Sequence, residues 1–144
     1  MKAQNICKKI IKKYENRLTC QYFDGELWVS KNDVLGSIGL INASDCKLNE
    51  ITKIEAEELL TEVLSKDLCY GVKLMPKESA KTKAKLFLEN LNEKSKLFTN
   101  SATPYHKKKN AWSFTPLSAK TMDTGVISKN GNEIEAILWA SDVD

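Results

Sequence analysis

The single histidine of the chain, His106, limits the catalytic chemistry that the sequence can carry. Any Ser/His or Cys/His pair must use this residue, which lies in a lysine-rich stretch with no Gly-x-Ser-x-Gly motif nearby. Gly36 and Gly39 do not form a phosphate loop, because the further glycine and the Lys-Ser/Thr pair are missing. A mechanism with two histidines and a histidine-rich metal site are therefore both excluded.

Three carboxylates near the end of the chain, Asp123, Glu133 and Glu135, could bind a metal ion. Carboxylates on neighbouring strands are hard oxygen ligands that suit Mg²⁺, as in the sheet of some restriction-type nucleases. That pattern normally ends in E-x-K, whereas this chain has a second glutamate in place of the lysine. The two glutamates also alternate with Ile134 and Ala136, as outward residues of a half-buried strand do. A divalent-metal nuclease is therefore the third hypothesis, and outside this hypothesis no metal or other cofactor is expected.

A basic and aromatic stretch surrounds His106. Its members are Tyr105, Lys107, Lys108, Lys109, Trp112 and Phe114. Bases stack on aromatic rings while lysines meet phosphates, so such a stretch can bind single-stranded nucleic acid. Core packing explains the tryptophan and the phenylalanine equally well, because residues i and i+2 share one side of a strand. Nucleic acid is therefore kept as an alternative partner.

A second set of candidate binding residues is a row of lysines, Lys77, Lys81 and Lys85, at four-residue spacing. On a helix these side chains line one face and repel one another by a few tenths of a kcal/mol. Such a row could meet an acidic partner, although a solvated face is the more common explanation.

The end of the chain offers a third set, in which Asp142 and Asp144 follow Trp139. An aromatic residue beside charges is a recurrent composition of binding hot spots. We expect an acidic patch beside an aromatic anchor if this short tail is held in place rather than frayed.

Four cysteines are spread widely, with none within four residues of another: Cys7, Cys20, Cys46 and Cys69. The sequence thus contains no C-x-x-C pair for zinc or redox chemistry. Lysines interrupt the apolar residues of the amino terminus, and no run approaches the roughly 18 apolar residues of a membrane span. We expect a cytoplasmic protein with no membrane contact and with free, mostly buried thiols.

The 144 residues, of which 42% are hydrophobic and 28% charged, predict one globular domain, 1–144. Its net charge of +3 is too small to imply nucleic acid by itself. Two hairpins are predicted: Asp24-Gly25 joins residues 19–23 to 26–30, and a type I′ turn at Asn130-Gly131 joins the two C-terminal runs. A short strand is expected at 111–114.

Three helices are predicted between and before these hairpins. The first covers residues 3–16. The second starts at a Thr52/Glu55 capping box, carries an apolar stripe through Leu68 and is expected to end at Gly71. The third begins near Pro76 and fades by about Ser95. Residues 31–50 stay unassigned, and 100–110 reads as an exposed loop. This order predicts an α+β fold, an antiparallel sheet built from two hairpins with about three helices on one face.

The segments 67–71 (DLCYG), 97–100 (LFTN) and the tail MDTGVI…AILWASDVD together resemble bacterial immunity proteins of polymorphic-toxin systems. The resemblance covers the C-terminal half and carries over no catalytic residue. It implies a cytoplasmic single-domain α+β protein that neutralises a toxin by direct binding.

We therefore expect a non-enzymatic interaction protein, and an immunity protein in particular, whose partner is a cognate toxin. A nucleic-acid-binding or phage-derived regulatory protein is the alternative. The sequence does not identify the toxin or the oligomeric state. The residues expected to contact the partner are Trp139, Asp142, Asp144, Lys77, Lys81, Lys85, Tyr105 and Lys107.

Overall fold

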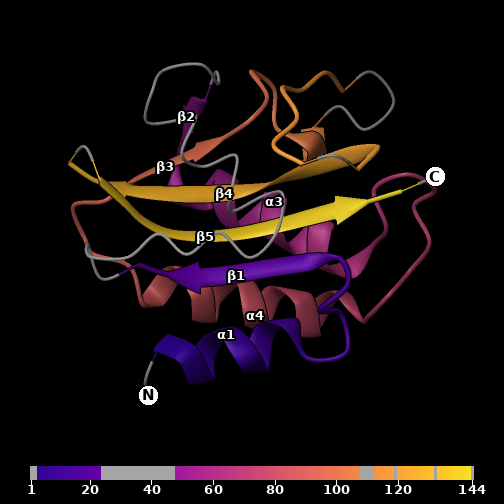
Figure 1. Ribbon diagram of the computed structural model, residues 1–144, viewed down its shortest axis with the longest axis horizontal. Coiled ribbons are helices and arrows are strands. Elements are labelled where there is room, and N and C mark those ends of the chain that lie inside the picture. Colours follow the sequence, from indigo (N-terminus) through magenta and orange to yellow (C-terminus); the bar gives the residue numbers. More distant parts are fainter. Residues whose placement is uncertain (1–2, 24–47, 108–111, 119, 132, 144) are drawn as a thin grey trace.

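The computed structural model describes residues 3–23, 48–107, 112–118, 120–131 and 133–143 (Figure 1). Five strands form one antiparallel sheet in the order β1-β5-β4-β3-β2. The strands are β1 (Leu18–Tyr22), β2 (Asn49–Ile51), β3 (Lys96–Thr99), β4 (Met122–Asn130) and β5 (Glu133–Asp142). The helices of the described residues are α1 (Ala3–Ile11), α3 (Lys53–Ser65), α4 (Lys77–Glu89) and the short 3₁₀ turn η1 (Tyr105–Lys107). The predicted α+β fold with an antiparallel sheet is confirmed.

The helices pack against one face of the sheet (Figure 1). Alternate strand residues such as Leu18, Val126 and Leu138 meet the helical residues there in the main hydrophobic cluster. The opposite face holds a second cluster, formed by Leu117, Ile127, Ile134, Ile137 and Trp139. Because β4 and β5 are buried on both faces, they form the centre of the molecule.

The terminal hairpin pairs β4 with β5 from Met122↔Asp142 to Asn130↔Glu133. A bulge shifts the register between Ser128 and Lys129, so the two-residue loop begins at Gly131, where φ is +66°. The predicted hairpin is confirmed, but its turn lies one residue later than predicted. Asn130 is the last paired residue of β4 and not a central turn residue.

The capping box of α3 is present as predicted. The Glu55 amide donates to Thr52 Oγ1 and the Thr52 amide donates to Glu55 Oε1, both at 3.1 Å. The helix ends at Ser65, before Leu68, because Lys66 is extended with φ −138° and ψ 148°. Gly71, with φ +69°, belongs to the following loop rather than to the helix end. At the end of the helix, the carbonyls of Val63 and Lys66 accept hydrogen bonds from the distant Arg17 side chain.

The other two helices are shorter than predicted. Helix α1 stops at Ile11, and Lys13 turns the chain with φ 75°. Helix α4 follows Pro76 as predicted and ends at Glu89. Its buried residues recur at helical spacing and form one face: Ala80, Ala84, Phe87 and Leu88.

The sheet differs from the predicted pair of hairpins. The run 26–30 lies outside the described residues, and β1 pairs with β5 instead. Strands β2 and β3 were not predicted, since short strands of three and four residues carry little periodicity. The prediction of a strand at 111–114 is wrong for residues 112–114, which form no regular secondary structure, and residue 111 lies outside the described residues. The expected exposed loop at 100–110 is also wrong in part, because Asn100, Ser101 and Tyr105 are buried.

Candidate protein interface

The tryptophan predicted as an exposed anchor lies in the interior. Trp139 is 1% exposed, and its Nε1 donates to Asp123 Oδ1 at 3.2 Å. Asp142, three residues later on the same strand, points to the opposite face and is 8% exposed. The prediction of an exposed patch is therefore wrong for these two residues, and Asp144 lies outside the described residues.

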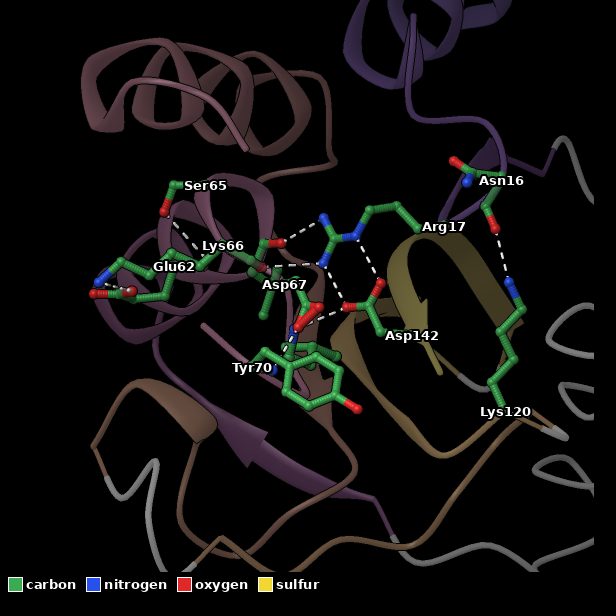
Figure 2. Close-up of polar contacts among 11 residues, drawn as sticks. Asn16, Arg17, Glu62, Ser65, Lys66, Asp67, Tyr70, Lys120 and Asp142 are labelled. Carbon is green, nitrogen blue, oxygen red and sulfur yellow. Dashed lines mark hydrogen bonds and ion pairs between the residues drawn. The ribbon is translucent and has the colours of Figure 1, made fainter. Parts of the chain in front are cut away.

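Asp142 instead forms a buried ion pair with Arg17 (Figure 2). The guanidinium is bidentate: Nε donates to Oδ1 at 2.8 Å and Nη2 donates to Oδ2 at 2.7 Å. Its remaining donors reach the end of α3, with Nη1 to the Val63 carbonyl at 2.8 Å and Nη2 to the Lys66 carbonyl at 3.2 Å. One arginine thus joins the chain before β1, the end of α3 and the end of β5.

The loop that follows α3 is fastened to this ion pair. The Leu68 amide donates to Asp142 Oδ2 at 2.9 Å, and the Leu68 side chain is buried. Within the loop, the Gly71 amide donates to the Asp67 carbonyl and the Asp67 amide donates to the Val72 carbonyl, both at 3.0 Å. The Asp67 carboxylate also accepts the Tyr70 amide at 2.6 Å. Residues 67–72 therefore form a tight turn whose conformation is set before any partner binds.

This turn presents large apolar side chains to solvent. Tyr70 is 68% exposed and Val72 57% exposed, on either side of Gly71. Val143, which is 62% exposed, follows directly after Asp142. We call Tyr70, Val72 and Val143 the Tyr70 surface: the first two lie on the turn whose Leu68 amide is bound to Asp142, and the third follows Asp142 in the chain.

The predicted lysine row faces α3. Lys77 Nζ lies 3.9 Å from Glu62 Oε1, and Lys85 Nζ lies 3.9 Å from Glu57 Oε1. Lys81 lines a groove between α3 and α4 together with Lys77 and Glu62. The acidic groups that these lysines approach therefore belong to the same chain. Exposed pairs at this distance contribute little to stability.

The stretch around His106 is folded over α3. His106 is mostly buried, with Nε2 3.1 Å from Glu58 Oε2, and burial lowers its pKa against the opposing effect of that carboxylate. Tyr105 is buried against Trp112 in an edge-to-face contact, with ring centres 5.2 Å apart. Lys107 Nζ donates to Glu55 Oε2 at 2.7 Å. Of the predicted binding residues, Tyr105 is thus part of the core and Lys107 is paired with a glutamate of the same chain. Lys108 and Lys109 lie outside the described residues.

The three candidate metal ligands do not converge. Asp123 is buried and accepts the amides of Leu117 and Ser118 at 3.0 and 2.9 Å. Glu135, at the bulge, accepts the hydroxyls of Ser95 and Ser128, both at 2.6 Å. Asp123 pairs with Ser141, six residues from Glu135, which corresponds to roughly 20 Å along a strand. Glu133 is exposed at the hairpin end, so the predicted carboxylate site is not formed.

Among the residues that the structure describes, no three histidine, cysteine or acidic side chains are grouped so that they could hold a metal ion. Among the same residues, no helix has the length and apolar character needed to cross a bilayer.

Sequence reasoning missed Arg17 and the Tyr70 surface. The signal available in the sequence was Gly71, a residue type that favours turns, with an aromatic and a β-branched residue beside it. Comparison with protein-family models, with curated proteins and with solved structures finds no match.

Proposed function

We propose that this chain is a non-enzymatic cytoplasmic protein that binds a protein partner through the Tyr70 surface, and that it acts as an immunity protein that covers a toxin. The observation that carries the proposal is the exposed Tyr70 on a turn braced by a buried ion pair. Tyrosine is enriched among the residues that dominate binding energy, because it buries a large ring and keeps a polar hydroxyl.

The rigidity of the turn supports this proposal. A protein that blocks another by occlusion needs a surface that loses little conformational entropy on binding. Residues 67–72 are already ordered by their own hydrogen bonds and by Asp142. The surface can therefore bind without first being ordered by its partner.

Charge near the turn indicates what kind of protein would fit. Lys66 and Lys73 form an isolated antiparallel bridge at the base of the turn, and Lys73 is exposed. Lys66 keeps 43% of its side chain exposed while lying 3.9 Å from Glu62. These cations beside the apolar side chains favour a partner with an apolar pocket rimmed by carboxylates.

Nucleic acid is less well supported as the partner. Lys107 is paired with Glu55, and Tyr105 is buried and cannot stack on a base. A nucleic-acid binder would use the basic stretch, and its binding would fall steeply with salt.

Photo-crosslinking tests the proposal directly. Benzoylphenylalanine replaces Tyr70 in one variant and Ile54 in a matched control, because Ile54 is 70% exposed but lies on α3, outside the Tyr70 surface. In lysate of the cells that encode the chain, we expect one protein adduct from position 70 and none from position 54. Coexpression of the captured protein with and without the chain then tests neutralisation.

Three outcomes would count against this function. Equal adducts from both positions would show that the Tyr70 surface is not selective. An absence of protein adducts, together with salt-sensitive binding to labelled oligonucleotides, would favour the nucleic-acid alternative. A captured protein that is harmless to cells without this chain would remove the immunity role while leaving the binding surface in place.

A further inference from the structure

Two cysteines that are far apart in the sequence meet inside the fold. Cys7 lies on α1 and Cys20 on β1, and the Cys20 thiol donates to Cys7 Sγ at 3.1 Å. A covalent S–S bond measures about 2.05 Å, so the two sulfur atoms need to approach by only about 1 Å to be bonded. Cys7 is buried, while Cys20 is partly exposed.

The packing of the N-terminal segment brings these thiols together. Ile6 and Ile10 bury one side of α1 in the main cluster, and Cys7 shares that side. The chain then reverses at Lys13, where φ is 75°, and the Leu18 amide closes the turn on the Tyr14 carbonyl at 2.8 Å. Strand β1 consequently returns alongside α1. Cys20 lies on the face of β1 shared by Leu18 and Tyr22, which is the face toward the helices.

We propose that Cys7 and Cys20 are a redox-active pair that a peroxide closes into a disulfide and a small thiol reopens, joining α1 to β1. The proposal does not depend on the function proposed above. It concerns a modification site formed by side chains that take no part in the Tyr70 surface.

The oxidation balances with one molecule of hydrogen peroxide. The Cys7 thiolate attacks one peroxide oxygen, an S–O bond forms, the O–O bond breaks, and the departing hydroxide takes up a proton to become water. Cys20 then loses its proton and its sulfur attacks Cys7 Sγ. The S–S bond forms, the S–O bond breaks, and a second water leaves. Two thiols are oxidised and the peroxide is reduced to two waters.

The hydrogen bond between the thiols assigns their roles. Donation from Cys20 lowers the pKa of the Cys7 thiol, and the same bond raises the pKa of the Cys20 thiol. Because the thiolate is the nucleophile, Cys7 is the residue that attacks the peroxide and Cys20 is the one that resolves the sulfenic acid.

The disulfide would restrain a segment that matters to the fold. The loop that it closes runs from residue 7 to residue 20 and contains Arg17. Closing a loop of this length limits the unfolded chain, so oxidation should raise the melting temperature by roughly 5–10 °C.

The test uses the reduced full-length chain, treated under native conditions with hydrogen peroxide and then alkylated in denaturant. We expect the intact mass before alkylation to fall by two hydrogen atoms, peptide mapping to join Cys7 to Cys20, and dithiothreitol to restore alkylation at both residues. Alkylation of both residues after peroxide treatment would overturn the proposal, as would a disulfide that links either of them to Cys46 or Cys69.

Two variants separate the roles of the pair. Cys20→Ser should convert Cys7 to sulfenic or sulfinic acid, which adds oxygen mass and gives no intramolecular disulfide. Cys69→Ser is the matched control and should form the disulfide as the parent chain does. If Cys20→Ser lost its fold, the mapping of the parent chain would still decide the proposal. A folded Cys20→Ser chain whose Cys7 resists peroxide would contradict the assignment of Cys7 as the attacking thiol.

Discussion

Two buried carboxylates on the central hairpin are stabilised in different ways. Asp142, on the helix side of β5, faces the bidentate guanidinium of Arg17. Asp123, on β4, lies on the opposite face of the sheet. It accepts hydrogen bonds from neutral donors, including two backbone amides and the Trp139 indole. One charge is balanced by a single cation, whereas the other is shared among several dipoles. The first arrangement should depend far more on one residue than the second.

The largest expected effect comes from Arg17→Met, which keeps an aliphatic stem but removes the cation. Asp142 would remain buried without its partner, and two carbonyls at the end of α3 would lose their donors. We expect a loss of about 3–5 kcal/mol in the free energy of unfolding, measured by urea titration. Lys120→Met is the matched control, because Lys120 is an exposed cation whose Nζ reaches the Asn16 carbonyl near Arg17 (Figure 2). Equal losses of unfolding free energy in the two variants would contradict the expectation that Asp142 depends on Arg17.

The second expected effect comes from Asp123→Ala. This change leaves the Leu117 and Ser118 amides and the Trp139 indole without their acceptor in the interior. We expect a loss of about 2–3 kcal/mol by the same titration, smaller than that of Arg17→Met because no unpaired charge is left behind. A loss greater than that of Arg17→Met would show that the dipoles stabilise the fold more than the ion pair does.

A third, smaller effect should follow from Trp139→Phe, which removes one neutral donor to Asp123 and keeps an aromatic ring. The other donors to this carboxylate remain, while the smaller ring also leaves a cavity in the second cluster, so the expected cost is about 1–2 kcal/mol. Thermal unfolding followed by far-UV circular dichroism measures it. A cost greater than that of Asp123→Ala would show that the packing and hydrogen bond of the indole matter more than all the donors to the carboxylate together.

The smallest effect is expected for the exposed pair of Lys107 and Glu55, which serves as a solvent-screened reference. This pair lowers the pKa of Glu55 from its usual range to about 2. A depressed carboxyl pKa contributes stability that is complete above the unfolded pKa, near 4.3, and is lost as pH falls toward the folded value. Lys107→Gln should therefore leave the melting temperature almost unchanged at pH 7 and flatten its decline between about pH 4 and 2. A large loss at pH 7 would contradict this ranking of buried above exposed pairs.

Local sequence determined the features whose partners are close along the chain. The Thr52/Glu55 capping box, the start of α4 after Pro76 and the hairpin near Gly131 each depend on residues within a few positions of one another. Turn chemistry and helix caps are local, so their residue types are visible without the fold. The turn still moved by one residue, because the bulge at Ser128 depends on pairing across the hairpin.

Tertiary structure decided what lies inside and what lies outside. A tryptophan beside aspartates is compatible with a binding surface or with a core, and only the second cluster on the sheet places Trp139 in the interior. Arg17 meets Asp142 across 125 residues, and Cys7 meets Cys20 because α1 and β1 pack together. The turn that carries the exposed Tyr70 is fastened to that distant ion pair. Contacts of this range follow from how the sheet and helices close on one another, which residue spacing along the chain does not encode.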